Sequence, residues 1–273
     1  MVRGDVMSRS IIKQKADLGE TLNGELIIDI HCHMGSYFNF WVCEGHAEGM
    51  LRAMDRVGVK IACPSHHWIV SGDFRAGNDA VADAQRRYPE RFIGFIGVNP
   101  NYADGVEEEI RRMSARGMKH LKIHSIHAIS YEDKKYDPVF EWAEANETCV
   151  VAHTWGGKDL DQLANRARRH PRARCIAAHA GCSEADKYIE LARTIKNLYL
   201  EICLSAAPYG MVEKLVRGAG AEKVLYGSDM PFYSMNPTIG RVLWARMSDD
   251  EKRRVLGLNA RELLALPVCP PLR

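Results

Sequence analysis

Five short apolar segments of this chain end in side chains that can bind a metal ion or move a proton. The side chains at these ends are His31 and His33, His124, His153, His179 and Asp229. Because side chains alternate between the two faces of a strand, the two histidines of the His-x-His pair point the same way. Neutral imidazoles combined with a carboxylate suit zinc, and also manganese or iron. The pattern predicts a metal centre.

Each of these residues also has a structural explanation when it is taken alone. A His-x-His pair on one strand is a weak sign, and a single histidine such as His153 or His179 is often only hydrogen-bonded. Asp229 follows Ser228 and could cap a helix. The prediction therefore depends on the combination: if the strands are parallel, all of these groups meet at one rim. Polar groups at the ends of buried strands need a partner, and a divalent ion would provide one.

Eight short apolar runs rich in Val, Ile or Leu alternate with amphipathic segments. The runs lie at 25–33, 57–64, 91–100, 118–124, 148–154, 173–181, 197–204 and 223–231. Such a rhythm predicts an α/β fold of parallel β-α units. The simplest closed arrangement of eight such units is a (β/α)8 TIM barrel, regular or distorted, with its active site where the strands end. A doubly wound open sheet is the competing architecture, but the sequence has no Gly-x-Gly-x-x-Gly or Walker motif to support it.

Composition and length limit the classes of protein to which this chain can belong. The chain has 273 residues and a formal net charge of +2, which argues against a nucleic-acid partner. No apolar run approaches the roughly 18 residues of a membrane span. We expect one domain over 25–273, which ends in extra C-terminal helices after the capping box Ser248–Glu251. Residues 1–24 are a short N-terminal extension, either a flexible lead or a short helix.

The cellular setting is also predicted from the sequence. The first two dozen residues have no hydrophobic centre, and no Cys-x-x-Cys pair occurs among the 8 cysteines. We therefore expect a cytoplasmic protein with reduced thiols, no membrane partner and a small-molecule substrate. A homodimer or a larger homo-oligomer is compatible with this prediction.

The strand-ending segments resemble the ordered signature of the amidohydrolase superfamily. The matching segments are IDIHCHMG, LKIH, VVAHTWGG, IAAHAG and LYGSDMPF. The chain is most similar to the amidohydrolase-related (amidohydrolase 2) branch, to which aminocarboxymuconate-semialdehyde decarboxylase-like enzymes belong. The resemblance covers about residues 25–266 and implies a metal-dependent TIM-barrel hydrolase.

The resemblance also implies roles for individual residues. His31, His33, His153 and Asp229 match the metal ligands, and Asp229 also matches the group that exchanges a proton with the activated water. His179 matches a histidine that orients the water and polarises the substrate. In two-metal relatives, that histidine binds a second ion that a carboxylated lysine bridges.

Lys122 lies at the position of that lysine. An unmodified lysine is a cation and would repel a second metal ion. We therefore expect one ion, most simply zinc, and we expect Lys122 to contact an anionic group of the substrate. Two ions bridged by a carboxylated Lys122 are the minority alternative. The other residues expected near the substrate are His66, His67, His124 and Trp155.

The expected reaction is hydrolysis of an amide or a lactone-type ester in a small carboxylated molecule. The metal would activate the water, with Asp229 as general base and then acid. The first alternative is a non-oxidative decarboxylase on the same scaffold. The second is a binding protein on a barrel that has lost its activity, although the full set of site residues argues against it.

Overall fold

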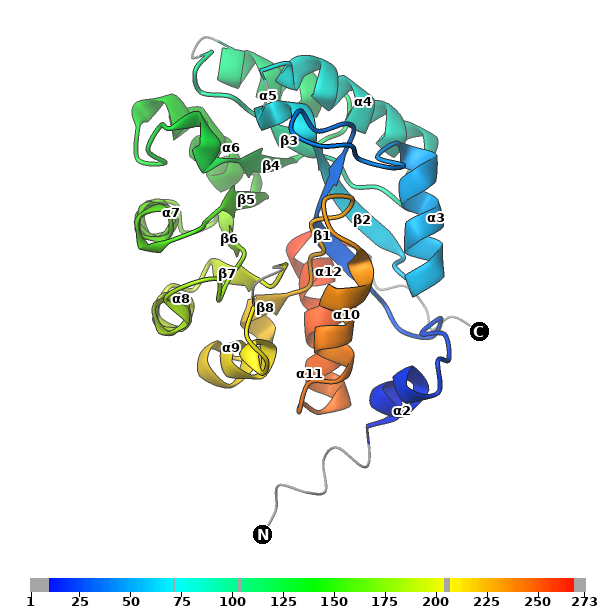
Figure 1. The fold of residues 1–273 in the computed structure, drawn as a ribbon. Coiled ribbons are helices and arrows are strands. Elements are labelled where there is room, and N and C mark those ends of the chain that lie inside the picture. The colour runs from blue at the N-terminus through cyan, green and yellow to red at the C-terminus, as the bar shows by residue number, and fades with distance from the viewer. Residues whose placement is uncertain (1–9, 71, 103–104, 204–206, 268–273) are drawn as a thin grey trace.

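The computed structural model describes residues 10–70, 72–102, 105–203 and 207–267, and it contains eight parallel strands surrounded by helices (Figure 1). The strands are β1 Ile28–Met34, β2 Ile61–His66, β3 Phe95–Gly97, β4 His120–Ile123, β5 Cys149–His153, β6 Arg174–Ala178, β7 Leu198–Glu201 and β8 Val224–Leu225. Each overlaps one of the eight predicted runs, and β1 and β2 continue one and two residues past theirs, so the predicted alternation is confirmed.

The strands form a closed ring in chain order. Strands β1 and β2 form one parallel pair, and β3 to β8 form a second parallel sheet. Backbone hydrogen bonds join the two sheets at both edges. Ala62 of β2 accepts from Ile93 at 3.0 Å, and the Ile30 amide of β1 donates to the Tyr226 carbonyl at 3.1 Å. The fold is therefore the predicted (β/α)8 TIM barrel, and all strands end at the same rim.

The helices cover the outside of the barrel (Figure 1). They are α2 Ile11–Asp17, α3 Ala47–Val57, α4 Phe74–Arg87, α5 Val106–Ser114, α6 Asp137–Asn146, α7 Gly157–Arg169, α8 Ala185–Thr194, α9 Met211–Ala219, α10 Met235–Leu243, α11 Asp249–Arg253 and α12 Asn259–Leu263. Short 3-10 helices lie at η1 His67–Val70, η3 Ser125–His127, η4 Lys134–Tyr136 and η5 Ala221–Lys223, and a π-helical segment, η6 Arg254–Leu258, joins α11 to α12.

Helix α3 shows how the outer layer is encoded. It buries Ala47, Met50 and Met54, which are spaced three and four residues apart and so form one apolar face against the sheet. It ends at Gly58, whose φ of 82° places it in the left-handed region where glycine is the favoured residue.

The barrel interior changes character from one end to the other. Near the amino ends of the strands it is filled by apolar side chains such as Ile28, Phe95 and Val151, and α12 contributes Leu263 and Leu264 to the same cluster. Near the carboxyl ends the inward positions are polar. The site therefore lies on an apolar base that closes one end of the barrel.

Both ends of the described chain pack on the barrel. The segment before β1 forms the short helix α2, which is tied to α11 through a hydrogen bond of 2.8 Å from the Ile11 amide to Asp249. Helix α11 begins with the predicted capping box of Ser248 and Glu251. Residues 1–9 of the predicted extension, and residues 268–273, lie outside the described residues. None of the helices in the described ranges is long and apolar enough to cross a membrane.

Candidate metal centre

Two histidines of β1 and the aspartate that follows β8 form a compact group at the rim. The ligand atoms of His31, His33 and Asp229 all lie within 4.8 Å of one another, and all three residues are buried. The His33 Nε2 atom is 2.9 Å from Asp229 Oδ1, and the His31 Nε2 atom is 3.7 Å from the same oxygen. These are three of the four residues that the resemblance matched to metal ligands.

A bulge in β1 turns both histidines inward. The register against β2 shifts between Asp29 and Cys32. Before the bulge Ile28 and Ile30 face the barrel interior, whereas strict alternation would have sent His31 and His33 outward. The bulge therefore brings apolar residues and the candidate metal ligands of one strand to the same inner face.

Each histidine is fixed through its second ring nitrogen. The His31 Nδ1–H donates to Glu201 Oε2 at 2.8 Å, and His33 Nδ1 pairs with the Ser65 hydroxyl at 3.1 Å. A hydrogen bond at Nδ1 sets the tautomer and the orientation of the ring, as it does for histidines that bind metals. It leaves the Nε2 atoms of both rings turned toward Asp229.

Glu201 lies beneath this group and is completely buried. Its carboxylate also accepts from the Cys203 amide, from the Cys203 thiol at 3.0 Å and from the His179 amide at 3.4 Å. A Cβ atom at position 227 would collide with this carboxylate and would lie 2.9 Å from His31 Cβ, so only glycine fits there. Burial raises the pKa of Glu201 to about 8.

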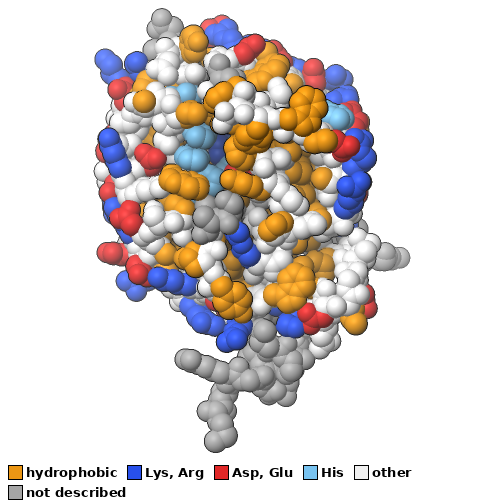
Figure 2. All heavy atoms as spheres, viewed as in Figure 1, with side chains coloured by type: hydrophobic (Ala, Val, Ile, Leu, Met, Phe, Trp, Pro, Cys, Tyr) orange, Lys and Arg blue, Asp and Glu red, His pale blue; other side chains and the backbone are white. Residues whose placement is uncertain are grey.

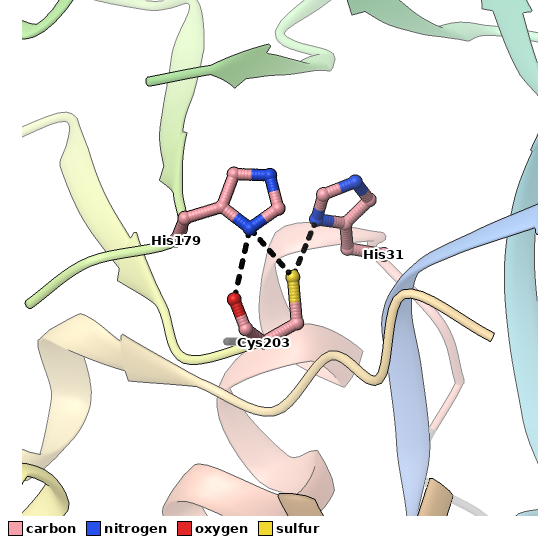
Figure 3. Close-up of side chains that lie close together, drawn as sticks. All are labelled: His31, His179 and Cys203. Atoms are coloured by element: carbon pink, nitrogen blue, oxygen red, sulfur yellow. Dashed lines mark hydrogen bonds between the residues drawn. The ribbon is translucent and has the colours of Figure 1, made fainter. Parts of the chain in front are cut away.

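A second group of donors, made up of His31, His179 and Cys203, shares His31 with the first (Figure 3). The Cys203 sulfur lies 3.1 Å from His31 Nδ1 and 3.2 Å from His179 Nδ1. The His179 Nδ1–H also donates to the Cys203 carbonyl at 2.9 Å. Burial raises the pKa of the Cys203 thiol well above its usual range, so the sulfur is a neutral thiol. We interpret this group as support for the rings rather than as a second metal site.

Asp29 connects β1 to the segment that carries Asp229. Its carboxylate accepts from the Ser228 amide at 3.0 Å, from the Ser228 hydroxyl at 2.5 Å and from the His31 amide at 3.3 Å. These bonds hold the end of β8 against β1. They therefore set the distance between Asp229 and the two histidines.

The charge states of the group fit a divalent cation. Burial lowers the pKa of His31 and His33, so both imidazoles are neutral at pH 7, which is the form that binds metal ions. Burial alone would raise the pKa of Asp229, but its hydrogen bond with His33 and the nearby rings of His31, His33 and His179 together outweigh burial, and the pKa lies well below the usual range. The donor set is thus two neutral nitrogens and one carboxylate, a combination found in catalytic metal sites with open positions.

His153 and His179 form a pair on the opposite side of the mouth. The His179 Nε2 atom lies 3.0 Å from His153 Nδ1, and the His153 ring stacks on His124 with 3.9 Å between ring centroids. Burial lowers the pKa of His153 to about 2. Among the described residues His153 does not belong to the close three-residue groups, so its role as a fourth ligand stays a prediction.

His179 leaves β6 through a left-handed turn. Ile176 and Ala178 face the barrel interior, so a continuing strand would send residue 179 outward. The φ of His179 is instead 62°, a region that non-glycine residues rarely occupy and that is common at functional sites. Asp229 has a similar φ of 61°. The left-handed turn lets the His179 side chain join the mouth.

Lys122 lies below the mouth rather than on its wall. It is 1% exposed, and its Nζ atom lies 2.5 Å from His31 Nε2. Burial lowers the pKa of this amine, which weakens its repulsion of a nearby cation. The structure places Lys122 beside the predicted ligands, and its predicted contact with substrate stays a prediction.

A cavity of about 200 Å³ opens above these groups. Its floor includes His33, His153, His179 and Asp229, and Figure 2 shows pale-blue histidine side chains among hydrophobic ones at this face. Its walls are largely aromatic. The aromatic lining residues are Tyr37, Trp155, Phe232 and Tyr233.

The predicted substrate contacts divide into two sets. His67, His124 and Trp155 line the cavity. His66 is buried behind the wall, where its Nδ1 atom accepts from the Trp68 amide at 3.1 Å, and it is not among the residues that line the cavity.

Several residues of the site have no role in the sequence prediction. Glu201 and Asp29 support the histidines from below, and Tyr37 and Phe232 form part of the wall. A signal for Glu201 was present, because a carboxylate inside the apolar run LYLEICL needs a buried partner. Nothing in the sequence marks the two wall residues, since aromatic residues in loops have many structural uses.

The comparisons with known proteins agree with this fold. Three solved structures show the same fold. They are 2,6-dihydroxybenzoate decarboxylase from Rhizobium (14% identity, TM-score 0.71, 89% of this chain and 99% of that chain), 5-carboxyvanillate decarboxylase from Novosphingobium aromaticivorans, complexed with manganese (14%, 0.69, 90% and 97%), and 4-oxalomesaconate hydratase from Rhodopseudomonas palustris (16%, 0.65, 88% and 96%). At these identities the likeness shows the fold alone.

A search of the curated proteins finds no match. A comparison with protein families matches residues 28–266 to the amidohydrolase family. The matched range contains all eight strands and every residue of the candidate metal centre. This chain therefore belongs to the amidohydrolase family.

Proposed function

We propose that this protein is a metal-dependent enzyme that removes the carboxyl group of a small one-ring aromatic acid as CO₂. The observation that carries the proposal is the cavity: an aromatic wall stands over a floor of imidazoles and one carboxylate. A cavity of about 150 Å³ holds a benzene ring, so about 200 Å³ suits one substituted ring. Two of the three relatives named above are decarboxylases of aromatic acids.

The amidohydrolase family is metal-dependent, and His31, His33 and Asp229 are the residues proposed to hold the ion. Their donor set suits zinc and also manganese, which is bound in the Novosphingobium relative. We propose a single ion, because the Lys122 amine contacts His31 and bridges no second group among the described residues. A bound divalent cation supplies Lewis-acid chemistry: it polarises a substrate oxygen and lowers the pKa of a coordinated water.

The protein's own residues would then transfer one proton. In decarboxylation the bond between the ring and the carboxyl carbon breaks, CO₂ leaves, and the ring carbon keeps the electron pair and takes up a proton. Asp229 is ionised at rest, so it first accepts a proton, from water or from a ring hydroxyl of the substrate, and then delivers it to that carbon. The aromatic wall orients the ring plane above the carboxylate.

Hydrolysis of a small carboxylated lactone or amide is the second candidate. The ionised Asp229 favours it, since a carboxylate beside the ligand nitrogens is placed to accept a proton from water. His179 lies across the mouth, where it could polarise a carbonyl group. Both candidates use the same floor, and they differ in whether a carbon–carbon bond or an acyl bond breaks.

The experiment that separates them follows two products in parallel. Protein loaded with zinc or manganese is incubated with a panel of hydroxybenzoates and a panel of lactones and N-acyl amino acids. Release of CO₂ in a 1:1 ratio to substrate loss supports decarboxylation. Acid production from a lactone or amide without CO₂ supports hydrolysis instead. A metal-loaded protein that turns over no member of either panel contradicts the proposal.

The Asp229→Asn variant tests the proton-transfer role on whichever substrate is found. We expect kcat to fall about 10²- to 10⁴-fold at saturating metal, because asparagine cannot accept the proton. Circular dichroism should match that of the unmodified protein. A kcat within a few-fold of the unmodified protein would show that Asp229 does not carry the proton.

A further inference from the structure

A second cavity lies between the loop that follows β7 and helix α10. Its volume is about 370 Å³, and it is lined by residues 207–213 together with Gly240, Arg241 and Trp244 of the α10 region. One lining segment follows β7, and the other consists of the last turn of α10 and the residues directly after it. None of its lining residues lines the cavity above the metal centre.

Arg241 is the unusual member of this lining. Its Nη1 atom is enclosed and has no hydrogen-bond partner. No nitrogen of its side chain forms a hydrogen bond or an ion pair with any of the described residues. Burial lowers the pKa of this guanidinium. Arg241 as a whole is half-buried, but a guanidinium nitrogen that is enclosed without a partner costs free energy, because it has lost the hydration it had in water.

Arg166 shows what a structural arginine looks like in the same protein. It is 3% exposed, and each of its three nitrogens has an acceptor. Nε donates to the Tyr131 carbonyl at 2.7 Å, Nη1 to Asp137 at 2.6 Å and Nη2 to the Asp133 carbonyl at 2.8 Å. The fold is therefore able to satisfy an arginine, and at Arg241 it does not.

The surroundings of Arg241 are suited to an organic anion. The one carboxylate in the lining, Glu213, is already engaged, because it accepts from the Arg246 amide at 3.0 Å. The remaining walls include Pro208, Met211 and the ring of Trp244, which is 47% exposed. A guanidinium presents paired N–H groups that match the two oxygens of a carboxylate.

We propose that this second cavity binds a small organic carboxylate, whose carboxyl group pairs with Arg241 and whose flat apolar body lies against the Trp244 side of the cavity. No described residue lines both this cavity and the cavity above the metal centre. The proposal does not depend on which reaction the metal centre catalyses.

The test uses protein stripped of metal with a chelator, so that no cation at the His–Asp group can hold a carboxylate. Benzoate, its neutral analogue benzamide, and inorganic phosphate are titrated by calorimetry. We expect benzoate to bind at least about tenfold more tightly than benzamide, and Arg241→Met to weaken benzoate binding about 10- to 100-fold. Arg217→Met, an exposed change on α9, is the matched control and should bind benzoate as the unmodified protein does.

Thermal unfolding without ligand separates a binding role from a structural one. If Arg241 serves a ligand, Arg241→Met should melt at the same temperature as the unmodified protein or higher, because it removes an enclosed guanidinium nitrogen that has no partner. Benzoate should raise the melting temperature of the unmodified protein and not that of the variant. Arg241→Lys keeps the charge without the paired geometry, and should show weakened benzoate binding even if Arg241→Met does not fold.

Three results would overturn the proposal. The first is benzoate affinity in Arg241→Met within twofold of the unmodified protein. The second is equal binding of benzamide and benzoate, which would show that Arg241 recognises no charge. The third is phosphate binding more tightly than benzoate, which would overturn the assignment to an organic carboxylate.

Discussion

The two ends of the barrel interior are built from the same strands but from opposite chemistry. At the amino ends, Ile28, Phe95 and Val151 pack against Leu263 of α12 in a closed apolar cluster. At the carboxyl ends, the inward positions carry imidazoles, carboxylates, a thiol and an amine, nearly all of them buried. The first arrangement lowers the free energy of the folded state, whereas the second raises it unless its polar groups find partners.

The difference shows how the protein can hold reactive groups in place. The polar end is rigid because its groups are bonded to one another through Glu201 and Asp29, and because the apolar end fixes the strands that carry them. Substitutions at the two ends should therefore affect different quantities. Those at the polar end should change metal binding and rate, and those at the apolar end should change stability.

The largest expected effect is at the polar end. Changing His31→Ala together with His33→Ala removes both ligand nitrogens of the group, and we expect the purified protein to contain almost no bound zinc or manganese by elemental analysis. Ile30→Val is the matched control, because Ile30 lies on the same strand but belongs to the apolar cluster. Full metal content in the double variant would mean that the ion binds elsewhere.

The corresponding change at the apolar end is Leu263→Ala. It removes a buried side chain from the cluster that closes the barrel, and should lower the free energy of unfolding by about 2–5 kcal/mol in a urea titration. Metal affinity measured under native conditions should stay the same. A loss of metal affinity in this variant would break the proposed separation between the two ends.

A smaller effect is expected at Glu201, between the two ends. Glu201→Gln keeps an acceptor for the His31 ring but replaces the carboxyl group behind it with an amide, and should weaken zinc affinity about 10- to 100-fold in a competition titration. Ser65→Ala, which removes the weaker partner of His33, provides the comparison. Unchanged affinity in Glu201→Gln would show that the carboxylate only fills space.

The last expected effect is a pH dependence of stability at the apolar end. His120 lies at the start of β4, where its Nδ1 atom accepts from the Cys149 amide at 3.1 Å, and burial lowers its pKa to about 3. The neutral ring is favoured in the folded state, so its contribution to stability is present above pH 6.5 and is lost as the pH falls toward 3. One such group changes the unfolding free energy by at most about 1.4 kcal/mol per pH unit.

His120→Gln should therefore flatten the fall in stability between pH 6 and pH 4. The measurement is a series of urea titrations across this range for both proteins. Identical slopes for the two proteins would show that another group dominates their acid sensitivity.

Much of the architecture was readable from the sequence. The eight strands were found because each is a short apolar run, and the rim was found because parallel strands end on the same side. That geometry predicts that His31, His33 and Asp229 lie at one rim, and the family resemblance selected them as a group. The sequence also predicted the capping box of α11, because it depends on neighbouring residues only.

What the sequence did not reveal depends on contacts between distant segments. The bulge in β1 is set by pairing with β2, and the bond between His31 and Glu201 joins residues 170 positions apart. Tyr37 and Phe232 become part of the cavity wall only because two loops meet above the floor. Such features come from packing between distant segments and produce no periodic pattern of residues in the sequence.

The left-handed turn at His179 has a consequence beyond this site. A single backbone torsion decides on which side of the barrel wall the residue after β6 appears, while the strand before it keeps its inward and outward faces. A reactive side chain at the mouth can therefore be gained or lost through the backbone conformation of one residue. The strands and the packing of the barrel would stay the same while the chemistry at the mouth changes.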